Sequence, residues 1–492
     1  MDYVLAHDLG TSGNKATLYD TSGTLIRSEK VTYATTYFGS NCAEQDPEDW
    51  WRAVCLSTKR LLREIDPSSI AAVSFSGHMM GCLPVDRDGR PLRMHMLYCD
   101  QRALSQVERL RDAIDVWEFY TTTGHRPSAS YTLPRVMWLQ ENEPDTYRAT
   151  YKFLNAKDYI VFRLTGQFAT DYSDAGGTEL FDINRLCWSE QIAQAAQVDL
   201  AKFPDAYEST HIAGEVTAAA SEQTGIPAGV PVCCGAGDGC AAGVGAGSLD
   251  DGTTYTSIGT SGWVGATSTD PIYDPQMRVP TFPHAVPGLY HSCGAMQTAG
   301  ASFTWAAQTI FGDAKDYAHM DQEMEEAGPG SHGVLFLPYL MGERSPWWDD
   351  SARGCFLGLQ PETTQGDMLR AVEEGVAFNL GTVLDVYREY IHVDDMMFVG
   401  GAATSDLWRC ILANVYNMPV SRPNNISECA SMGAAVIGAV GVGLLSGFDA
   451  ARPFFRAVST QMPNIQTARF YGERIRVFQQ AYLALREVFP FL

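Results

Sequence analysis

Hydrophobic and polar residues alternate in short runs near the start of the chain. Val4, Ala6 and Asp8 occupy one face of the first run, residues 16–20 form a second run, and a turn at 21–23 leads to a third. A period of two is typical of β-strands, because successive side chains of a strand point to opposite faces. The pattern therefore predicts three hairpin-linked strands within residues 3–37.

Helical periodicity dominates much of the remaining chain. Apolar side chains recur on one side of residues 48–63, among them Trp51, Val54 and Leu62. The same criterion predicts further helices over 104–121, 133–141, 157–164, 368–390, 406–416 and 470–488, and strands over 70–76, 396–399 and, as a pair, within 253–267. Strands that alternate with helices along the whole length indicate an α/β fold.

Composition narrows the class of protein. The chain has 492 residues, enough for two or more domains, and a formal net charge of -23. Such an acidic protein is a poor partner for nucleic acid or anionic membranes, although a local phosphate site with Mg²⁺ still allows ATP to bind. Residues 432–445 are too short and too rich in glycine for a membrane span, which predicts a buried helix.

The start of the chain and the cysteines indicate a compartment. The first residues contain neither a basic region nor a long apolar run, so we expect no signal peptide. The twelve cysteines are scattered and show no metal-type spacing. We therefore predict a cytoplasmic protein with free thiols.

The tetrapeptide Gly-Thr-Ser-Gly occurs twice, at 10–13 and at 259–262, each time after a strand-like run. One copy alone would most often be an ordinary turn. Two copies on opposite sides of a cleft could hold a polyphosphate through backbone N–H groups and hydroxyls. Between them, Asp238 lies in the glycine-rich segment 235–239 and could accept a proton from an attacking hydroxyl. The combination predicts a kinase that acts on a small molecule.

A third glycine-rich turn follows the predicted strand 396–399. Gly400 and Gly401 lead to the helix 406–416, with Ser405 as its expected N-cap. A strand, a glycine-rich turn and a helix together form an arrangement that binds nucleotides. The repeated hairpin predicts two similar halves, which we place at 1–247 and 248–452. Residues 453–492 then form a helical tail that could return to the first half.

Several of these segments resemble the FGGY carbohydrate kinases. The similar segments are 8–15, 235–243, 257–262, 337–346, 354–359 and 399–405, while 44–51 and 156–174 look most like the xylulokinase branch. The resemblance covers nearly the whole chain in the right order. It implies two ribonuclease H-like domains of the actin and hexokinase ATPase type around a central cleft. It also implies that the γ-phosphate of ATP is transferred, with Mg²⁺, to a hydroxyl of a sugar, and that the protein is a possible homodimer.

The resemblance also implies roles for individual residues. Asp238 is the candidate general base, and Asp8 is the candidate acid near the metal, acting through water. We expect the two carboxylates on opposite walls of one nucleotide-lined crevice. The candidate phosphate contacts are Gly10, Thr11, Ser12, Lys15, Gly259, Thr260 and Ser261, and the candidate adenosine contacts are Gly400, Gly401 and Ala402. The alternatives are a strand-end cap for Asp8 and a solvated side chain for Lys15.

The sugar pocket departs from the family pattern. Its candidates are His78, Met79, Met80, Asp100 and Arg102, together with Asp238. Met80 stands where xylulokinases usually carry a histidine, and a thioether cannot donate a hydrogen bond to a sugar hydroxyl. On a strand, His78 would face the same side as Met80 and could replace it. Gly239 also stands where asparagine is common. We give Trp347 and Trp348 no role.

These departures leave the acceptor open. A ketopentose is favoured, with D-xylulose converted to D-xylulose 5-phosphate. Another sugar, a polyol or a sugar acid is the first alternative. A non-catalytic, actin-like nucleotide-binding regulator is the second, although such a protein would need no base.

Overall fold

The first sheet of the protein is built around the N-terminal hairpin. A computed structural model describes residues 2–39, 41–312, 317–424, 426 and 428–492. In it β1 (Tyr3–Gly10), β2 (Gly13–Asp20) and β3 (Leu25–Thr32) form an antiparallel meander, which confirms the predicted strands. On its other side β1 pairs in parallel with β6 (Ile70–Gly77), and β16 (Ala236–Gly237) pairs with β6. The turn at 10–13 and the segment that leads to Asp238 therefore lie at the same end of this sheet.

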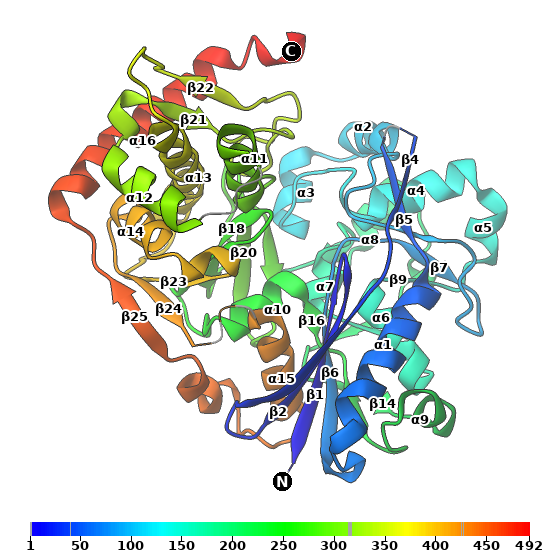
Figure 1. Cartoon of the computed structure of the whole chain (residues 1–492). Coiled ribbons are helices and arrows are strands. Elements are labelled where there is room, and N and C mark those ends of the chain that lie inside the picture. The colour runs from blue at the N-terminus through cyan, green and yellow to red at the C-terminus, as the bar shows by residue number, and fades with distance from the viewer. Residues whose placement is uncertain (1, 40, 313–316, 425, 427) are drawn as a thin grey trace.

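A second sheet repeats this plan. The antiparallel hairpin of β17 (Thr254–Ile258) and β18 (Gly262–Ser268) surrounds the second Gly-Thr-Ser-Gly turn, and β17 pairs in parallel with β23 (Met396–Val399). Its full order is β19-β20-β18-β17-β23-β24-β25. The two sheets lie in separate lobes, and helices cover them (Figure 1). The predicted two-domain α/β architecture is thus confirmed.

Most predicted helices form close to their expected bounds. In the first lobe α1 (Pro47–Leu61) begins at an Asp46 cap, and in the second lobe α13 (Gln365–Arg388) begins at a Thr364 capping box. Ser405 caps α14 (Asp406–Tyr416) as predicted, with its Oγ 3.2 Å from the backbone nitrogen of Trp408.

The other first-lobe elements are α4 (Thr132–Asn142), α5 (Pro144–Ala149), α6 (Ala156–Thr165), α7 (Tyr172–Gly176), α8 (Glu190–Ala196), α9 (Ala218–Thr224), β4 (Thr36–Phe38), β5 (Cys42–Gln45), β7 (Leu83–Val85), β8 (His95–Met96), β9 (Lys152–Leu154), β10 (Ala169–Asp171), β11 (Phe181–Asp182), β12 (Cys187–Trp188), β13 (Asp205–Tyr207), β14 (Ile212–Glu215) and β15 (Pro231–Cys233). The other second-lobe elements are α11 (Gly300–Phe311), α12 (Tyr317–Ala327), β19 (Thr281–Pro283), β20 (Tyr290–Met296), β21 (Leu335–Leu337), β22 (Cys355–Leu357), β24 (Val420–Pro423) and β25 (Ala457–Gln461).

The single helix predicted over 104–121 is wrong. The chain forms α2 (Leu104–Ala113) and α3 (Val116–Thr123), separated by an extended Ile114. Asp115 accepts a hydrogen bond from the backbone nitrogen of Glu118 at 2.9 Å and so caps a new helix. Apolar periodicity continues across the break, which is why the pattern concealed it.

Two helices pack against each other where the two lobes meet. The helix α10 (Asp238–Gly245) packs against α15 (Cys429–Gly441), and α15 also packs on β1 and β6 of the first sheet. A Cβ on Gly433 would lie 1.8 Å from the carbonyl oxygen of Ala241, and one on Gly245 would lie 1.8 Å from that of Cys429. Only glycine permits this approach, so Gly433, one of the glycines that argue against a membrane span, serves helix packing instead. Within the described residues, no helix is both long enough and apolar enough to cross a bilayer.

The C-terminal tail does not return to the first lobe as predicted. The helix α16 (Ile465–Leu485) packs on α13, α14 and β21 of the second lobe, with a hydrogen bond of 2.6 Å from the Tyr471 hydroxyl to Glu374. The preceding 3₁₀ segment (Phe448–Phe454) does reach the first lobe, where the Phe454 ring lies against Gly23. The aromatic face of α16 fits the apolar surface around Phe378, and this decides its direction.

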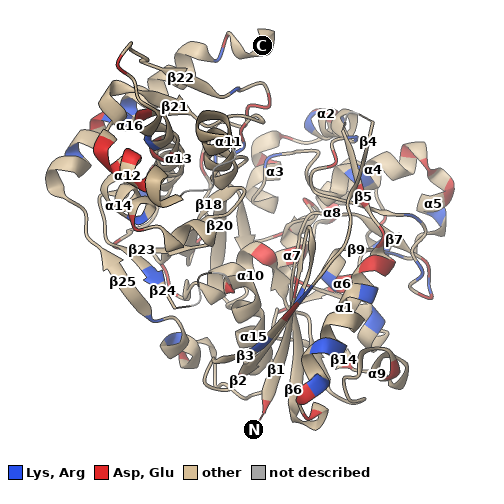
Figure 2. Cartoon of the chain, in the orientation of Figure 1, with Lys and Arg blue, Asp and Glu red and all other residues tan. Residues whose placement is uncertain are grey.

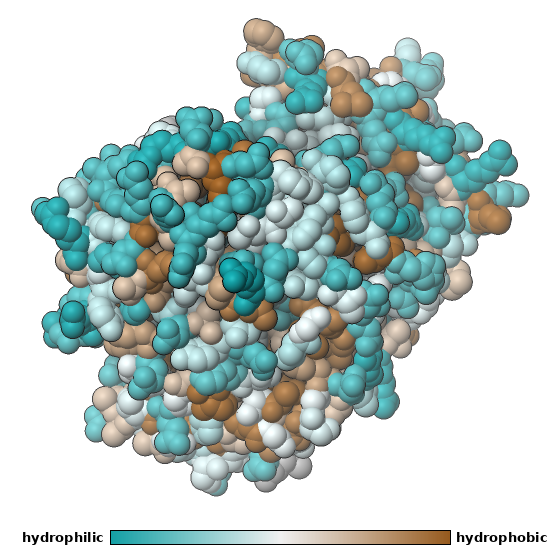
Figure 3. All heavy atoms as spheres, turned by 180° about the vertical axis from the view of Figure 1, so that it is seen from behind, coloured by the Kyte–Doolittle hydropathy of each residue, from teal (hydrophilic) through white to brown (hydrophobic). Residues whose placement is uncertain are grey.

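Charged residues lie mainly on the outer helices of both lobes, with acidic side chains prominent on α12 (Figure 2). The face seen in Figure 3 is largely hydrophilic, with small separate apolar groups.

Candidate active site

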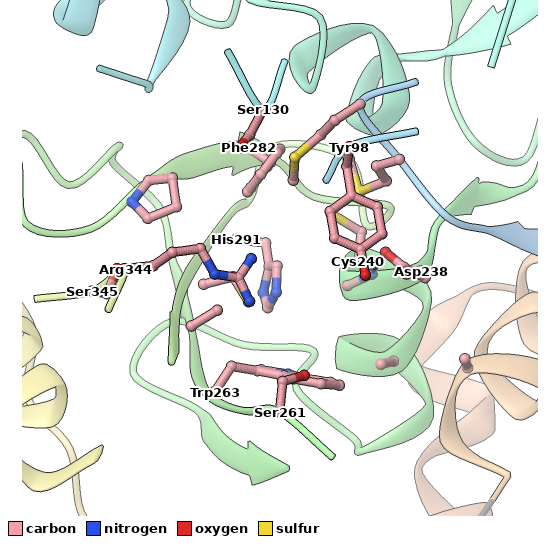
Figure 4. Close-up of a pocket in the computed structure, with 18 of the residues that line it drawn as sticks. Tyr98, Ser130, Asp238, Cys240, Ser261, Trp263, Phe282, His291, Arg344 and Ser345 are labelled. Carbon is pink, nitrogen blue, oxygen red and sulfur yellow. Dashed lines mark hydrogen bonds between the residues drawn. The ribbon is translucent and has the colours of Figure 1, made fainter. Parts of the chain in front are cut away.

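A cavity of about 390 Å³ lies between the two lobes and receives side chains from both (Figure 4). The first lobe contributes Asp8, Gly10, Thr11, Met79, Met80, Tyr98, Ser130, Tyr131, Asp238, Gly239, Cys240 and Ala242. The second lobe contributes, among others, Ser261, Trp263, Phe282, His291, Cys293, Arg344, Ser345 and Trp348. The structure thus brings predicted site residues from distant parts of the chain to one place.

The two candidate carboxylates share this cavity, but they lie on the same wall. Asp8 stands opposite Ser76 of β6, whose Oγ donates a hydrogen bond of 2.9 Å to it. Gly237, which directly precedes Asp238, stands opposite Gly77 of the same strand. The expectation of opposite walls is therefore wrong, because β6 lies between β1 and β16 in a single sheet. The facing wall comes from the second lobe.

Asp238 is electrostatically prepared to accept a proton. Burial within the cavity walls, followed by the negative charge of Asp8, raises its pKa to about 7. The backbone nitrogen of Gly239, at 2.8 Å, and the charge of Arg344 act in the opposite direction. A carboxyl with a pKa near neutrality is well suited to general base catalysis. Burial also raises the pKa of Asp8, while the hydrogen bond from Ser76 and the charge of Lys15 lower it.

The first phosphate-loop candidate, at 10–13, is held open toward the cavity. Gly10 and Thr11 belong to the lining, whereas Ser12 and Lys15 do not belong to it in the described structure. The Gln45 amide donates to the Thr11 carbonyl at 2.7 Å, and the Tyr33 hydroxyl donates to that of Gly10 at 2.5 Å. The ammonium group of Lys15 lies 3.2 Å from the carboxylate of Glu428, just before α15.

The second phosphate-loop candidate sits at the start of α11. The nitrogen of Gly300 donates to the carbonyl of Gly259 at 2.9 Å, and that of Ala299 donates to Thr260 at 3.0 Å. Ser261 lines the cavity, while Gly259 and Thr260 are exposed to solvent. The loop is therefore hydrogen-bonded to the start of α11 and accessible to solvent.

The candidate adenosine turn adjoins this loop. Gly400 has φ +87°, and a Cβ there would lie 2.7 Å from the carbonyl oxygen of Ile258 at the end of β17. Gly401 and Ala402 begin the following 3₁₀ turn (Gly401–Thr404). A Cβ on Gly401 would meet no atom within 4 Å in the described structure, so its face is open for contact.

Only part of the predicted sugar pocket lines the cavity. Met79 and Met80 do so, but His78 packs in the first lobe against Trp50 and His95. The strand ends at Gly77, and Met80 has φ +66°, so the alternation that was to place His78 beside Met80 does not continue. The expectation that His78 replaces Met80 in the pocket is therefore wrong.

Asp100 and Arg102 pair with each other behind the cavity. Arg102 binds both carboxylate oxygens of Asp100, at 2.8 and 2.7 Å, and Asp100 also accepts a hydrogen bond from the nitrogen of Ala43 at 2.8 Å. Their polar groups are thus satisfied within the protein, and neither residue lines the described cavity.

The sequence pattern missed Arg344, whose side chain reaches into the cavity from the second lobe (Figure 4). Its backbone nitrogen donates to Glu343 at 2.8 Å, and that of Ser345 donates to Ala295 at 3.0 Å, which fixes the loop. Among the described residues the buried Nε of Arg344 finds no hydrogen-bond acceptor. Its place in the family-like segment 337–346 was the available signal.

Tyr98, His291 and Trp348 also line the cavity without having been predicted. His291 comes from β20, with its Nε2 3.3 Å from the Tyr255 hydroxyl. Trp348 donates its indole N–H to the carbonyl of Arg278 at 3.0 Å. His291 and Trp348 lie in no motif and come to the cavity only through the tertiary fold.

Comparisons with known proteins agree with this geometry. Residues 3–245 match the N-terminal domain model, and residues 254–442 the C-terminal domain model, of the FGGY family of carbohydrate kinases. A xylulose kinase of Staphylococcus xylosus is 30% identical over 484 residues, which cover 98% of this chain and 100% of the relative.

Solved structures show the same similarity. A ligand-bound xylulose kinase from Lactobacillus acidophilus has a TM-score of 0.94 at 27% identity, with 99% of both chains covered. A gluconate kinase from Lactobacillus acidophilus has a TM-score of 0.93 at 27% identity, with 98% of both chains covered. The acceptors named for these two proteins differ, although the folds are nearly the same.

Proposed function

Because the chain belongs to the FGGY family of carbohydrate kinases and is a sugar kinase, we propose that it transfers the γ-phosphate of ATP to a hydroxyl of a ketopentose. The preferred acceptor is D-xylulose, which would yield D-xylulose 5-phosphate. Family membership decides against a non-catalytic regulator. One observation carries the proposal: Asp8 and Asp238 line a single cavity between two lobes that each present a Gly-Thr-Ser-Gly turn.

Asp238 serves as the general base. It accepts the proton of the attacking hydroxyl as the bond from that oxygen to phosphorus forms and the bond to the leaving ADP breaks. Its position in the cavity and its pKa of about 7 support this role.

Asp8 is the residue that would lie next to the metal ion. It accepts a hydrogen bond from Ser76 and lies beside a second carboxylate, so the pair suits a hard cation bound partly through water. Mg²⁺ supplies neutralising charge to the phosphates when bound. Thr11 and Ser261 present hydroxyls and backbone N–H groups to the phosphates, and Gly400, Gly401 and Ala402 adjoin the adenosine.

Arg344 contributes positive charge from the second lobe. Phosphoryl transfer depends on positioning and on stabilising charge on the transferred group. A guanidinium whose Nε lacks an acceptor among the described residues, facing a carboxylate base, suits this purpose. The same group could pair with a carboxylate of the acceptor, so a sugar acid is the second candidate substrate. The similarity to a gluconate kinase supports that alternative.

An acceptor panel tests the proposal. ADP release is measured with Mg²⁺ and ATP on ketoses, polyols and aldonic acids, and kcat/KM is compared. We expect the highest value with D-xylulose. The highest value with an aldonic acid would replace the ketopentose by the second candidate, and no turnover with any member would contradict the function.

A further inference from the structure

A buried charge cluster lies behind Asp238 in the first lobe. The ammonium of Lys157 on α6 is 2.9 Å from Asp171, 3.2 Å from Asp174 and 2.6 Å from Asp158. All four side chains are at most 3% exposed. Burying such a charge cluster costs free energy and adds little net stability. Its position behind the base therefore points to a role other than stability.

Ser173 connects this cluster to the segment that carries the base. Its Oγ donates to Asp171 at 2.5 Å and accepts a hydrogen bond from the backbone nitrogen of Gly237 at 3.0 Å. A hydroxyl has one proton, so donation to the carboxylate leaves its lone pairs for the Gly237 N–H. The chain of contacts therefore runs from Lys157 through Asp171 and Ser173 to the residue directly before Asp238.

Gly237 needs such a restraint. A Cβ there would lie 2.3 Å from the Sδ of Met79, so a larger residue would push the Met79 side chain aside in the cavity wall. Glycine leaves the backbone conformationally free, which is unfavourable immediately before a base that must be aligned. The hydrogen bond from Gly237 to Ser173, and another from Gly235 to the Ser209 carbonyl at 3.0 Å, fix both ends of this short segment.

We infer that Ser173 is a positioning residue for the general base and that Asp171 and Lys157 hold its hydroxyl in place. The inference rests on the proposed role of Asp238. Ser173 does not line the described cavity, and it restrains the base through the Gly237 peptide. Because small displacements of a reacting group can cost roughly 100-fold in rate, loss of this bond should lower kcat with little effect on substrate binding.

Two serine variants test the inference. Ser209 donates to the same Asp171 oxygen as Ser173, at 2.8 Å, but its hydroxyl does not touch Gly237. We expect Ser173→Ala to lower kcat about 10- to 100-fold with KM for ATP within about twofold of wild type. Ser209→Ala, the matched control, should change kcat by less than about twofold. Ser173→Thr, which keeps the hydroxyl, should restore most of the loss.

A double-mutant cycle with Asp238→Asn separates this inference from the proposed function. If Ser173 acts through the base, Ser173→Ala should have little further effect once Asp238 is replaced. Equal losses in both backgrounds, or equal losses for Ser173→Ala and Ser209→Ala, would overturn the positioning role. Near-normal turnover of Asp238→Asn alone would instead overturn the proposed base. Melting temperatures of all variants, measured in parallel, show whether each one folds.

Discussion

At the scale of single residues, the surroundings of Asp238 determine its chemistry. Protein walls and Asp8 disfavour its charged form, while Arg344 favours it. A base works only when ionised, so activity should rise as the pH increases through about 7, where Asp238 loses its proton.

Replacing Arg344 tests whether its charge lowers the pKa of Asp238 across the cavity. Removing a positive charge raises the pKa of a nearby carboxyl, so Arg344→Gln should move the acid limb of the kcat/KM profile to higher pH, in addition to lowering the rate. The exposed Arg353, farther along the chain, is the matched control, and Arg353→Gln should leave the profile unchanged. An acid limb that does not move in Arg344→Gln would show that the two charges do not interact.

The residues that the sequence singles out in glycine-rich motifs, among them Asp8, Thr11, Asp238 and Ser261, line the cavity, and their roles stay predictions. His78 does not line the described cavity, because the strand ends one residue earlier, and Asp100 does not line it either, since its polar groups are satisfied by Arg102 and Ala43. Arg344 and His291 reach the cavity from strands and loops far along the chain. The place of Arg344 in the family-like segment 337–346 is a signal for it, whereas no local pattern marks His291.

At the scale of elements, the glycine pair after β23 separates backbone geometry from ligand contact. Gly400 has a left-handed φ and touches β17, whereas Gly401 has no such constraint. Gly400→Ala should therefore lower the melting temperature and raise KM for ATP together, because it disturbs the strand that leads to the second phosphate loop.

Gly401→Ala, its matched control, should leave the melting temperature unchanged. If the adenosine contact is real, this variant should still raise KM for ATP. An unchanged KM in Gly401→Ala would contradict the predicted contact, and an unchanged melting temperature in Gly400→Ala would contradict the backbone argument.

The sequence predicts which helices and strands form more accurately than it predicts where they begin and end. Strands around both Gly-Thr-Ser-Gly turns and the helix after Ser405 lie within a few residues of their expected bounds. The apolar pattern runs without interruption across the break at Asp115, so it does not reveal the capping hydrogen bond that starts a new helix there.

At the scale of the whole molecule, the crossing of α10 and α15 joins the base-bearing helix to the two lobes. Lys15 of the first sheet and Glu428, just before α15, form an ion pair across this junction. The repeated hairpin revealed the two-lobed plan, but not the direction of α16, which depends on which apolar surface remains uncovered. The homodimer stays a prediction.

A cavity shared by two lobes also bears on the hydrolysis of ATP, in which water competes with the acceptor as the nucleophile. A kinase limits wasteful hydrolysis by completing its site only when the acceptor is bound. The cavity, lined from both sides, agrees with such closure. ATP hydrolysis without acceptor should therefore be slow compared with phosphorylation.

The central claim is that Asp238 removes the proton during phosphoryl transfer in this cavity. The most direct test is the rate of ADP release by wild type and Asp238→Asn, each with and without the best acceptor of the panel. We predict that acceptor strongly stimulates the wild type, and that Asp238→Asn loses about 10²- to 10⁴-fold in kcat while KM for ATP is largely retained. Near-normal stimulated turnover in Asp238→Asn would contradict the account.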